Sequence, residues 1–314
     1  MSTLDLRPAP AVPTPSRWNR PLVVLAAAMA VLAVVTAVLA VVDPQRVLGQ
    51  NAWFKPLKFA LSIGVYALTM AWLVGLPGLR RPRLAAGAAA VTTAGLAVEI
   101  VIIVWAAATG TTSHFNVATA LSTTLWSVMG VSIAVVWVTT AVVGLLVFRS
   151  PLPDRARTLA VRAGVVLGLV GMALAFLMTT PTAAQLADFR GVAGAHAVGV
   201  PDGGPGLPFL GWSTEGGDLR IGHFVGLHAL QVLPLGLLAL EVAGRRVAAL
   251  REEGVRFRLV AVAAVGYAGL VALLTVQALL GQPLLEPSPL VLTVAVGGAV
   301  GLTGLAAGAL RRGR

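Results

Sequence analysis

Four histidines and one glutamate inside an apolar run are the side chains of this 314-residue chain that could carry chemistry. A neutral imidazole binds metals and transfers protons near neutral pH. A carboxylate in an apolar setting carries protons, binds cations or acts as a general base. The five residues are His114, His196, His223, His228 and Glu99. Because all four histidines fall on one side of the apolar runs, we predict that they share a polar site with Glu99.

Glu99 lies near the middle of an apolar run over residues 84–108. A charged carboxylate at that depth costs a few kcal/mol unless it is paired, so such residues are functional by default. We predict a catalytic or proton-carrying role, with a hydrogen bond to a neighbouring helix as the alternative. Lys58 begins the preceding run on the same side. It either reaches inward to Glu99 or lies at the membrane interface.

Helical spacing decides which of these groups act together. His223 and His228 are five residues apart, about 140° around a helix, so they are not the i, i+4 pair that holds zinc on one face. His228 and Gln231 share a face. Asp218 stands where it would cap the helix that carries His223 and direct that helix's positive end at the site. The predicted ligand-binding set is His114, His196, His223, His228, Gln231, Lys58 and Asp218, with His196, His223 and His228 as the candidate metal ligands.

The chain contains no cysteine. This excludes disulfides, thiolate metal sites, iron–sulfur clusters and covalently attached haem. A transition metal or haem b bound through histidine remains the candidate cofactor. No His-Glu-x-x-His motif, phosphate loop or nucleophile elbow occurs, so the sequence does not decide whether the protein is an enzyme.

Long apolar segments must position these residues. Hydrophobic residues make up 57% of the chain, charged residues 11%, and the mean hydropathy is +0.89. Runs of about 20 apolar residues span a bilayer as helices, because lipid cannot satisfy an open backbone. We therefore predict an all-α polytopic membrane helix bundle of about eight transmembrane helices. The runs are 22–42, 57–76, 84–108, 119–148, 163–180, 222–243, 259–281 and 289–310.

The basic residues predict the orientation of this bundle. Of the 23 lysines and arginines, 18 lie in the N-terminal tail, the even-numbered links and the C-terminal tail, and five lie on the other side. The positive-inside rule then places both termini in the cytoplasm. Arginine greatly exceeds lysine, which is typical of a GC-rich bacterial genome, so we expect a multi-pass protein of the bacterial plasma (inner) membrane. The net charge of +11 reflects topology and not a nucleic-acid partner.

The chain divides into three parts. Residues 1–20 are polar and proline-rich, and we expect a disordered cytoplasmic tail. Residues 21–310 form the bundle, including an extracytoplasmic loop at 181–221, and residues 311–314 form a basic cytoplasmic tail. That loop is rich in glycine and proline, and its length is typical of a functional segment. Its apolar residues, Trp212 among them, favour an ordered lid.

Four stretches of the sequence resemble an uncharacterised family of multi-spanning bacterial membrane proteins. They are WFKPLKFALSIGVY (53–66), GTTSHFN (110–116), HAVGVPDGGPGLPFLGWSTEGGDLR (196–220) and HFVGLHALQVLPL (223–235). Ala197 stands where the family has threonine. The family has no assigned activity, so the resemblance implies a similar fold alone. Haem A synthase also has eight spans and four histidines. Its haem ligands are spread over alternate helices, whereas here the sixth span carries two histidines and the second and eighth carry none, so it is an architectural analogy alone.

These observations leave three hypotheses. The leading one is an outward-facing polar His/Glu site that binds a metal, haem or small ligand. The second is a proton- or cation-coupled transporter that uses Glu99, although no inverted repeat supports it. The third is a scaffold protein that docks a partner through the 181–221 loop. The lipid bilayer is the one partner that the sequence requires, and it leaves the oligomeric state open.

Overall fold

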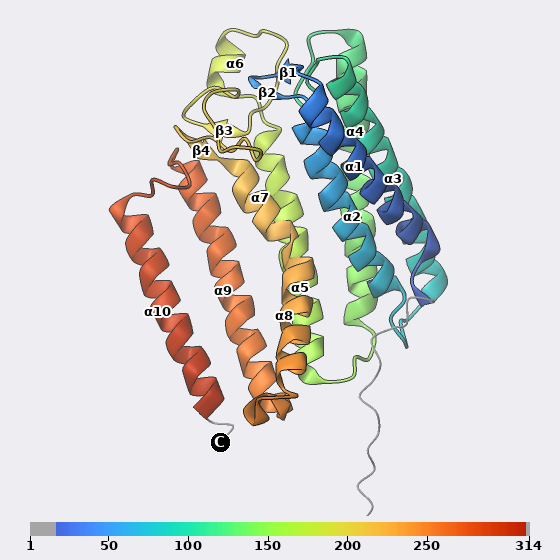
Figure 1. Ribbon diagram of the computed structural model, residues 1–314, viewed down its shortest axis with the longest axis vertical. Helices are drawn as coiled ribbons and strands as arrows, with labels where there is room; N and C mark the ends of the chain where they lie inside the picture. Colours follow the sequence, from blue (N-terminus) through green and yellow to red (C-terminus); the bar gives the residue numbers. More distant parts are fainter. Residues whose placement is uncertain (1–16, 312–314) are drawn as a thin grey trace, which may run out of the picture.

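The fold is a bundle of long helices that run roughly side by side (Figure 1). A computed structural model describes residues 17–311, so most of the predicted N-terminal tail and residues 312–314 lie outside the described residues. The long helices are α1 (Arg20–Val42), α2 (Phe54–Val74), α3 (Pro82–Ala108), α4 (Ala120–Phe148), α5 (Arg155–Leu174), α9 (Glu253–Leu279) and α10 (Pro289–Arg311). The shorter ones are α6 (Ala183–Ala187), α7 (Leu219–Leu227), α8 (Ala229–Ala243), η2 (Ala175–Met178) and η3 (Ala248–Arg251).

Within residues 17–311, seven helical segments are long and apolar enough to cross a membrane, and α7 with α8 makes an eighth if the bent pair is one span. The predicted all-α polytopic bundle is therefore confirmed. Every predicted run overlaps one of these segments. The helices α5 and α9 begin earlier than their apolar runs, at Arg155 and Glu253, because helical structure continues past the apolar part of the sequence.

Side-chain caps fix where several helices begin. Asn19, Thr119 and Asp154 accept hydrogen bonds from backbone amides in the first turns of α1, α4 and α5. Each cap satisfies an amide that has no partner within the helix. Asp218 caps α7 in the same way, which confirms the prediction made for it.

The helices form two groups. In the first, α1 packs on α2 and α3 on α4, and most of the large buried core belongs to these four helices. In the second, α5 packs against α7, α8 and α9. The helix α10 lies at the edge against α9, and Val291 and Ala309 are its only buried residues (Figure 1).

A 46° bend separates α7 from α8. The helix α8 continues through Pro234, and the bend lies at His228, between the two helices. Before the bend, α7 packs backbone to backbone on α5, because backbone atoms of Gly226 and Leu227 occupy the space that a Cβ at Gly171 would need. That contact holds α7 close against α5.

Both small β-ladders lie at one end of the bundle, which we call the loop end (Figure 1). There β1 (Arg46–Val47) pairs antiparallel with β2 (Gln50–Asn51), and β3 (Ala197–Val198) pairs antiparallel with β4 (Gly217–Asp218). The segment 181–221, which we call the lid, contains α6, the β3–β4 ladder and two isolated bridges, Asn116 with Val192 and Gly206 with Ser213. The first turn of α1 and the last turn of α10 lie at the opposite end of the bundle. We call it the basic end, because the arginine-rich links of the sequence lie there.

Candidate functional site

Two cavities meet at the loop end between the two helix groups. The deep cavity, of about 490 Å³, is lined by α2, α3 and α4 on one side and by α5, η2 and α7 on the other. The outer chamber, of about 150 Å³, lies between the β1–β2 hairpin, α2 and the lid. Lys55, His196 and Arg220 line both. These three side chains therefore stand where a polar chamber continues into the bundle.

The deep cavity combines aromatic walls with polar groups. Its aromatic lining includes Phe59, Phe115, Trp126 and Trp137. The polar or ionisable side chains that line it are Lys55, Ser62, Tyr66, Glu99, His114, Ser127, Thr179, His196, Arg220 and His223. Three of the four histidines predicted to share a site with Glu99 thus line one cavity with it.

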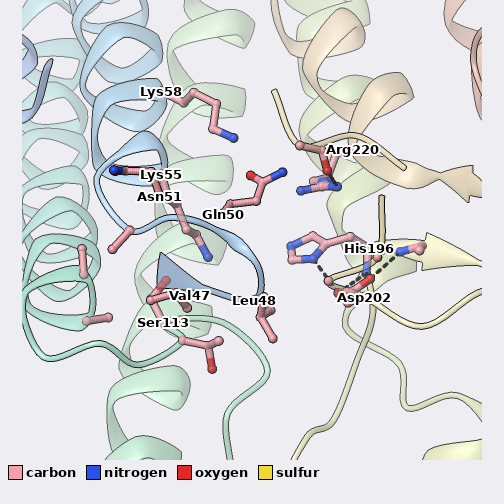
Figure 2. A pocket seen from close by; sticks show the side chains of 18 of the residues that line it. Val47, Leu48, Gln50, Asn51, Lys55, Lys58, Ser113, His196, Asp202 and Arg220 are labelled. Atoms are coloured by element: carbon pink, nitrogen blue, oxygen red, sulfur yellow. Dashed lines mark hydrogen bonds and ion pairs between the residues drawn. The ribbon is translucent and has the colours of Figure 1, made fainter. Parts of the chain in front are cut away.

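His196 is fixed in the lid by Asp202 (Figure 2). Its Nδ1 donates to an Asp202 carboxylate oxygen at 2.7 Å, and the backbone amides of His196 and Ala197 donate to the same carboxylate. Burial opposes ionisation of Asp202, but these donors hold its pKa to about 2. Burial lowers the pKa of His196, against the opposing hydrogen bond to Asp202. His196 is therefore neutral, with Nε2 left as a hydrogen-bond acceptor.

His223 and His114 are held by different partners. His223 Nδ1 lies 2.8 Å from the carbonyl oxygen of Gly171, and because a carbonyl can only accept, Nδ1 carries the proton; in the neutral ring Nε2 is then the acceptor. His114 Nδ1 lies 3.0 Å from the Ser113 hydroxyl, and its ring packs near Trp126. Burial lowers the pKa of His114 well below its usual range. His114 and His196, which lie outside the spanning helices, thus present neutral rings to the cavity.

Glu99 and Lys55 face the deep cavity without a hydrogen-bond partner. Glu99 is only 4% exposed, yet neither its carboxyl group nor the Lys55 ammonium forms a hydrogen bond or ion pair with any described residue. The two groups are near enough to interact electrostatically. The sequence does not single out Lys55. The signal for it is the i, i+3 spacing, which places Lys55 one turn before Lys58, at the start of α2.

Lys58 closes the lid and is not the partner of Glu99. Its Nζ donates to the Leu210 carbonyl at 2.7 Å and lies 5.8 Å from the centre of the Phe209 ring. Arg220 makes a second such bond, from Nη2 to the Gly211 carbonyl at 2.6 Å. Figure 2 shows Lys58 and Gln50 on one wall of the outer chamber, facing Arg220 and His196 on the other. Lys58 thus belongs to the site as the residue of α2 that binds the lid.

Asp218 stabilises the site without lining either cavity. It is 1% exposed and lines neither cavity. Its carboxylate accepts from the backbone amides of Ser213 and Arg220 and from Arg220 Nε at 2.9 Å. This ion pair neutralises Arg220 and holds its guanidinium where the two cavities meet.

His228 and Gln231 lie outside both cavities. Their predicted shared face is confirmed, since His228 Nδ1 is 3.2 Å from Gln231 Oε1, and Gln231 donates to Thr69 of α2 at 3.1 Å. These bonds join α8 to α2, so the two residues hold helices together and do not bind a ligand in the cavity. The sequence cannot show this because helical spacing does not say which neighbouring helix a face meets.

The three-histidine metal site is not assembled. Within residues 17–311, no group of three or more His, Cys, Asp or Glu side chains is placed to hold a metal ion. His228 is bonded to Gln231 away from the cavity, and the Nδ1 atoms of His196 and His223 are engaged by Asp202 and Gly171. The structural reason is that each of the three histidines is held by a different partner, in the lid, on α5 or beside α8.

Comparison of the chain with protein-family models, curated proteins and solved structures gives no match. The class of the protein is therefore given by its fold, a multi-spanning helix bundle, and its function is argued from its own residues.

Proposed function

We propose that this membrane protein binds a small organic ligand in the deep cavity. The observation that carries this proposal is that Lys55 and Glu99, on neighbouring helices, line one cavity with no hydrogen-bond partner among the described residues. Buried polar groups in proteins are nearly always hydrogen-bonded, and leaving one without a partner costs about 1–3 kcal/mol. A ligand that supplies the missing partners recovers that free energy on binding.

The unpaired groups define the chemistry of the ligand. Lys55 donates, whereas Glu99 and the Nε2 atoms of His196 and His223 accept. A complementary ligand therefore carries an acceptor oxygen, such as a phosphate or carboxylate, together with a hydroxyl or amine. The aromatic walls accept an apolar body. A volume of about 490 Å³ lies within the usual range for small-molecule sites.

The distribution of charge supports a location for the site. The links at the basic end hold the arginine clusters that start at Arg80, Arg149 and Arg245, whereas the loop end carries few basic residues. By the positive-inside rule the basic end faces the cytoplasm. The ligand site would then open on the outer side of a bacterial plasma membrane, with both termini inside.

A transporter is the second candidate, and Glu99 is the observation that favours it. A buried carboxyl without a hydrogen bond, in a membrane-spanning helix, is the kind of group that carries protons or cations. The cavities at the loop end, however, share no lining residue with the groove between α4, α5 and α9 at the basic end. Proton-driven uptake into proteoliposomes that Glu99→Gln abolishes would establish transport in place of simple binding.

The binding proposal is tested by native mass spectrometry of protein purified from its membranes. We expect a small molecule bound at a ratio near one to one. Lys55→Met should reduce its occupancy roughly tenfold or more, because a hydrogen bond to a charged group contributes about 1.5–3 kcal/mol. Thr69→Val is the matched control, since Thr69 lies on the same helix and bonds Gln231 outside the cavity. Equal occupancy in the two variants, or no bound molecule in any of them, would refute the proposal.

A further inference from the structure

The wall of the deep cavity is open on the outside of the bundle between α4 and η2. Val131 of α4 is 66% exposed and Phe176 of η2 is 52% exposed, although both line the cavity. Ser127, Gly130 and Thr179 complete this part of the lining. Side chains enclosed within the bundle would not be so accessible, so they form the rim of a side opening.

The side opening lies at the depth of the hydrocarbon core. Val131 is about 16 Å along the axis of α4 from its first residue, Ala120, at the loop end. The helix α4 is an apolar candidate span. The rim carries no charged side chain, and its hydroxyls are already bonded: Ser127 donates to Thr123 and Thr179 to Phe176. Such a rim suits contact with acyl chains and not with water.

Entry from the aqueous side is more restricted. The lid lines the outer chamber, is fastened to α2 by the bond from Lys58 to Leu210, and is held internally by the bond from Arg220 to Gly211. That chamber is also the smaller of the two, about 150 Å³ against about 490 Å³. The side opening therefore offers a second route into the larger cavity, and it needs no movement of the lid.

We infer that the ligand is a membrane amphiphile that enters through the side opening from the bilayer. Its polar head lies between Lys55 and Glu99, and its hydrocarbon chain passes Val131 and Phe176 into the leaflet at the loop end. This inference rests on the proposed function and adds the class of ligand to it. A phospholipid headgroup that carries hydroxyls fits the donors and acceptors of the cavity, since the phosphate accepts from Lys55 and the hydroxyls donate to Glu99.

Gly130 offers a way to block the opening without disturbing the fold. A Cβ added at Gly130 meets no atom within 4 Å, so a side chain can be built from this lining position without an initial collision, and a large one is expected to occupy the opening. Gly301 on α10 is equally free of neighbours and lies far from the cavity. Gly130→Phe and Gly301→Phe are thus the same substitution in two lipid-facing helices, with only the first at the side opening.

The experiment uses the full chain in vesicles that contain phosphatidylglycerol with a photoreactive acyl chain. After illumination, mass spectrometry should locate crosslinks on cavity residues such as Trp126 and Met172, as well as on the outer faces of the helices. Gly130→Phe should reduce the cavity crosslinks roughly tenfold, equivalent to ~1.4 kcal/mol, and Gly301→Phe should leave them unchanged. Gly130→Leu, a smaller plug, repeats the test if the phenylalanine variant fails to fold.

Two results would overturn the inference: cavity crosslinks that are equally strong in Gly130→Phe and Gly301→Phe, or no cavity crosslinks in the wild-type protein. Native mass spectrometry then separates this failure from that of the proposed function. A bound molecule that still depends on Lys55 would show a water-soluble ligand in the same cavity. Without any such molecule, the proposed function fails as well.

Discussion

Replacing Asp202 with asparagine should loosen the lid around His196. The carboxylate accepts three hydrogen bonds, from His196 Nδ1 and from the amides of His196 and Ala197. An asparagine oxygen can retain part of this arrangement, but it has no charge and its amide nitrogen cannot accept. The perturbation therefore removes the ionised acceptor while keeping the size of the side chain.

The magnitude follows from the pKa of Asp202. A value of about 2, against 3.8 for an unperturbed aspartate, means that folding of the lid favours the ionised carboxylate by about 2 kcal/mol, because each tenfold change in the dissociation constant is worth about 1.4 kcal/mol. The side chain is 22% exposed, so solvent screening reduces this only modestly. A loss of about 2 kcal/mol raises the population of the open lid roughly 30-fold.

Hydrogen exchange of the backbone amides in residues 196–202 measures that population directly. At pH 7, Asp202→Asn should exchange roughly 30-fold faster than the wild type in this segment. Asp188→Asn is the control, since Asp188 lies in the same lid in an exposed pair with Arg190, and such pairs contribute little. Equal exchange in Asp202→Asn and Asp188→Asn would refute the reasoning.

The pH dependence has a definite sign. The pKa of Asp202 is lowered by folding, so its contribution is complete above pH 3.8 and is lost as the pH falls toward 2. The pKa of His196 is also lowered, so below about pH 6.5 the unfolded lid binds a proton that the folded lid does not, which again destabilises the lid in acid. The wild type should lose both contributions, and Asp202→Asn only the second.

Three further outcomes are expected. Because the chain has no cysteine, Ser288→Cys should react with a membrane-impermeant thiol reagent in intact cells and Gly254→Cys should not; labelling of Gly254→Cys would contradict the proposed orientation. Gly171→Ala should destabilise the protein by more than 1–3 kcal/mol, the usual cost of overpacking, whereas Gly236→Ala, with no neighbour near its added Cβ, should be neutral in thermal unfolding. Glu99→Gln should leave thermal unfolding unchanged and lower ligand occupancy roughly tenfold, and full occupancy would remove Glu99 from the site.

The sequence predicts the helices well because hydrophobicity along a segment is a local property. All eight apolar runs correspond to observed helices, and the cap at Asp218 follows from its position before α7. The position of the bend is different. Pro234 is the obvious local signal, but the bend occurs at His228, next to the close packing of Gly171 against α7. That packing depends on two helices far apart in the sequence.

The site is predicted only in part, because it also depends on contacts between segments far apart in the sequence. His114, His196, His223 and Glu99 do line one cavity, as their common side of the bundle indicates. The partner of His196 is not predicted, since the lid has no periodicity that would bring Asp202 back onto it. Nor is Lys55, because composition does not tell which of two neighbouring lysines the lid engages.

The lid is fastened through its main chain. Lys58 and Arg220 bind the carbonyl oxygens of Leu210 and Gly211, atoms that every amino acid possesses. Replacing the Leu210 side chain therefore leaves the hydrogen bond from Lys58 in place. Inserting or deleting one residue nearby moves both carbonyls away from their donors. During evolution the side chains of the lid can therefore change, whereas its length is constrained.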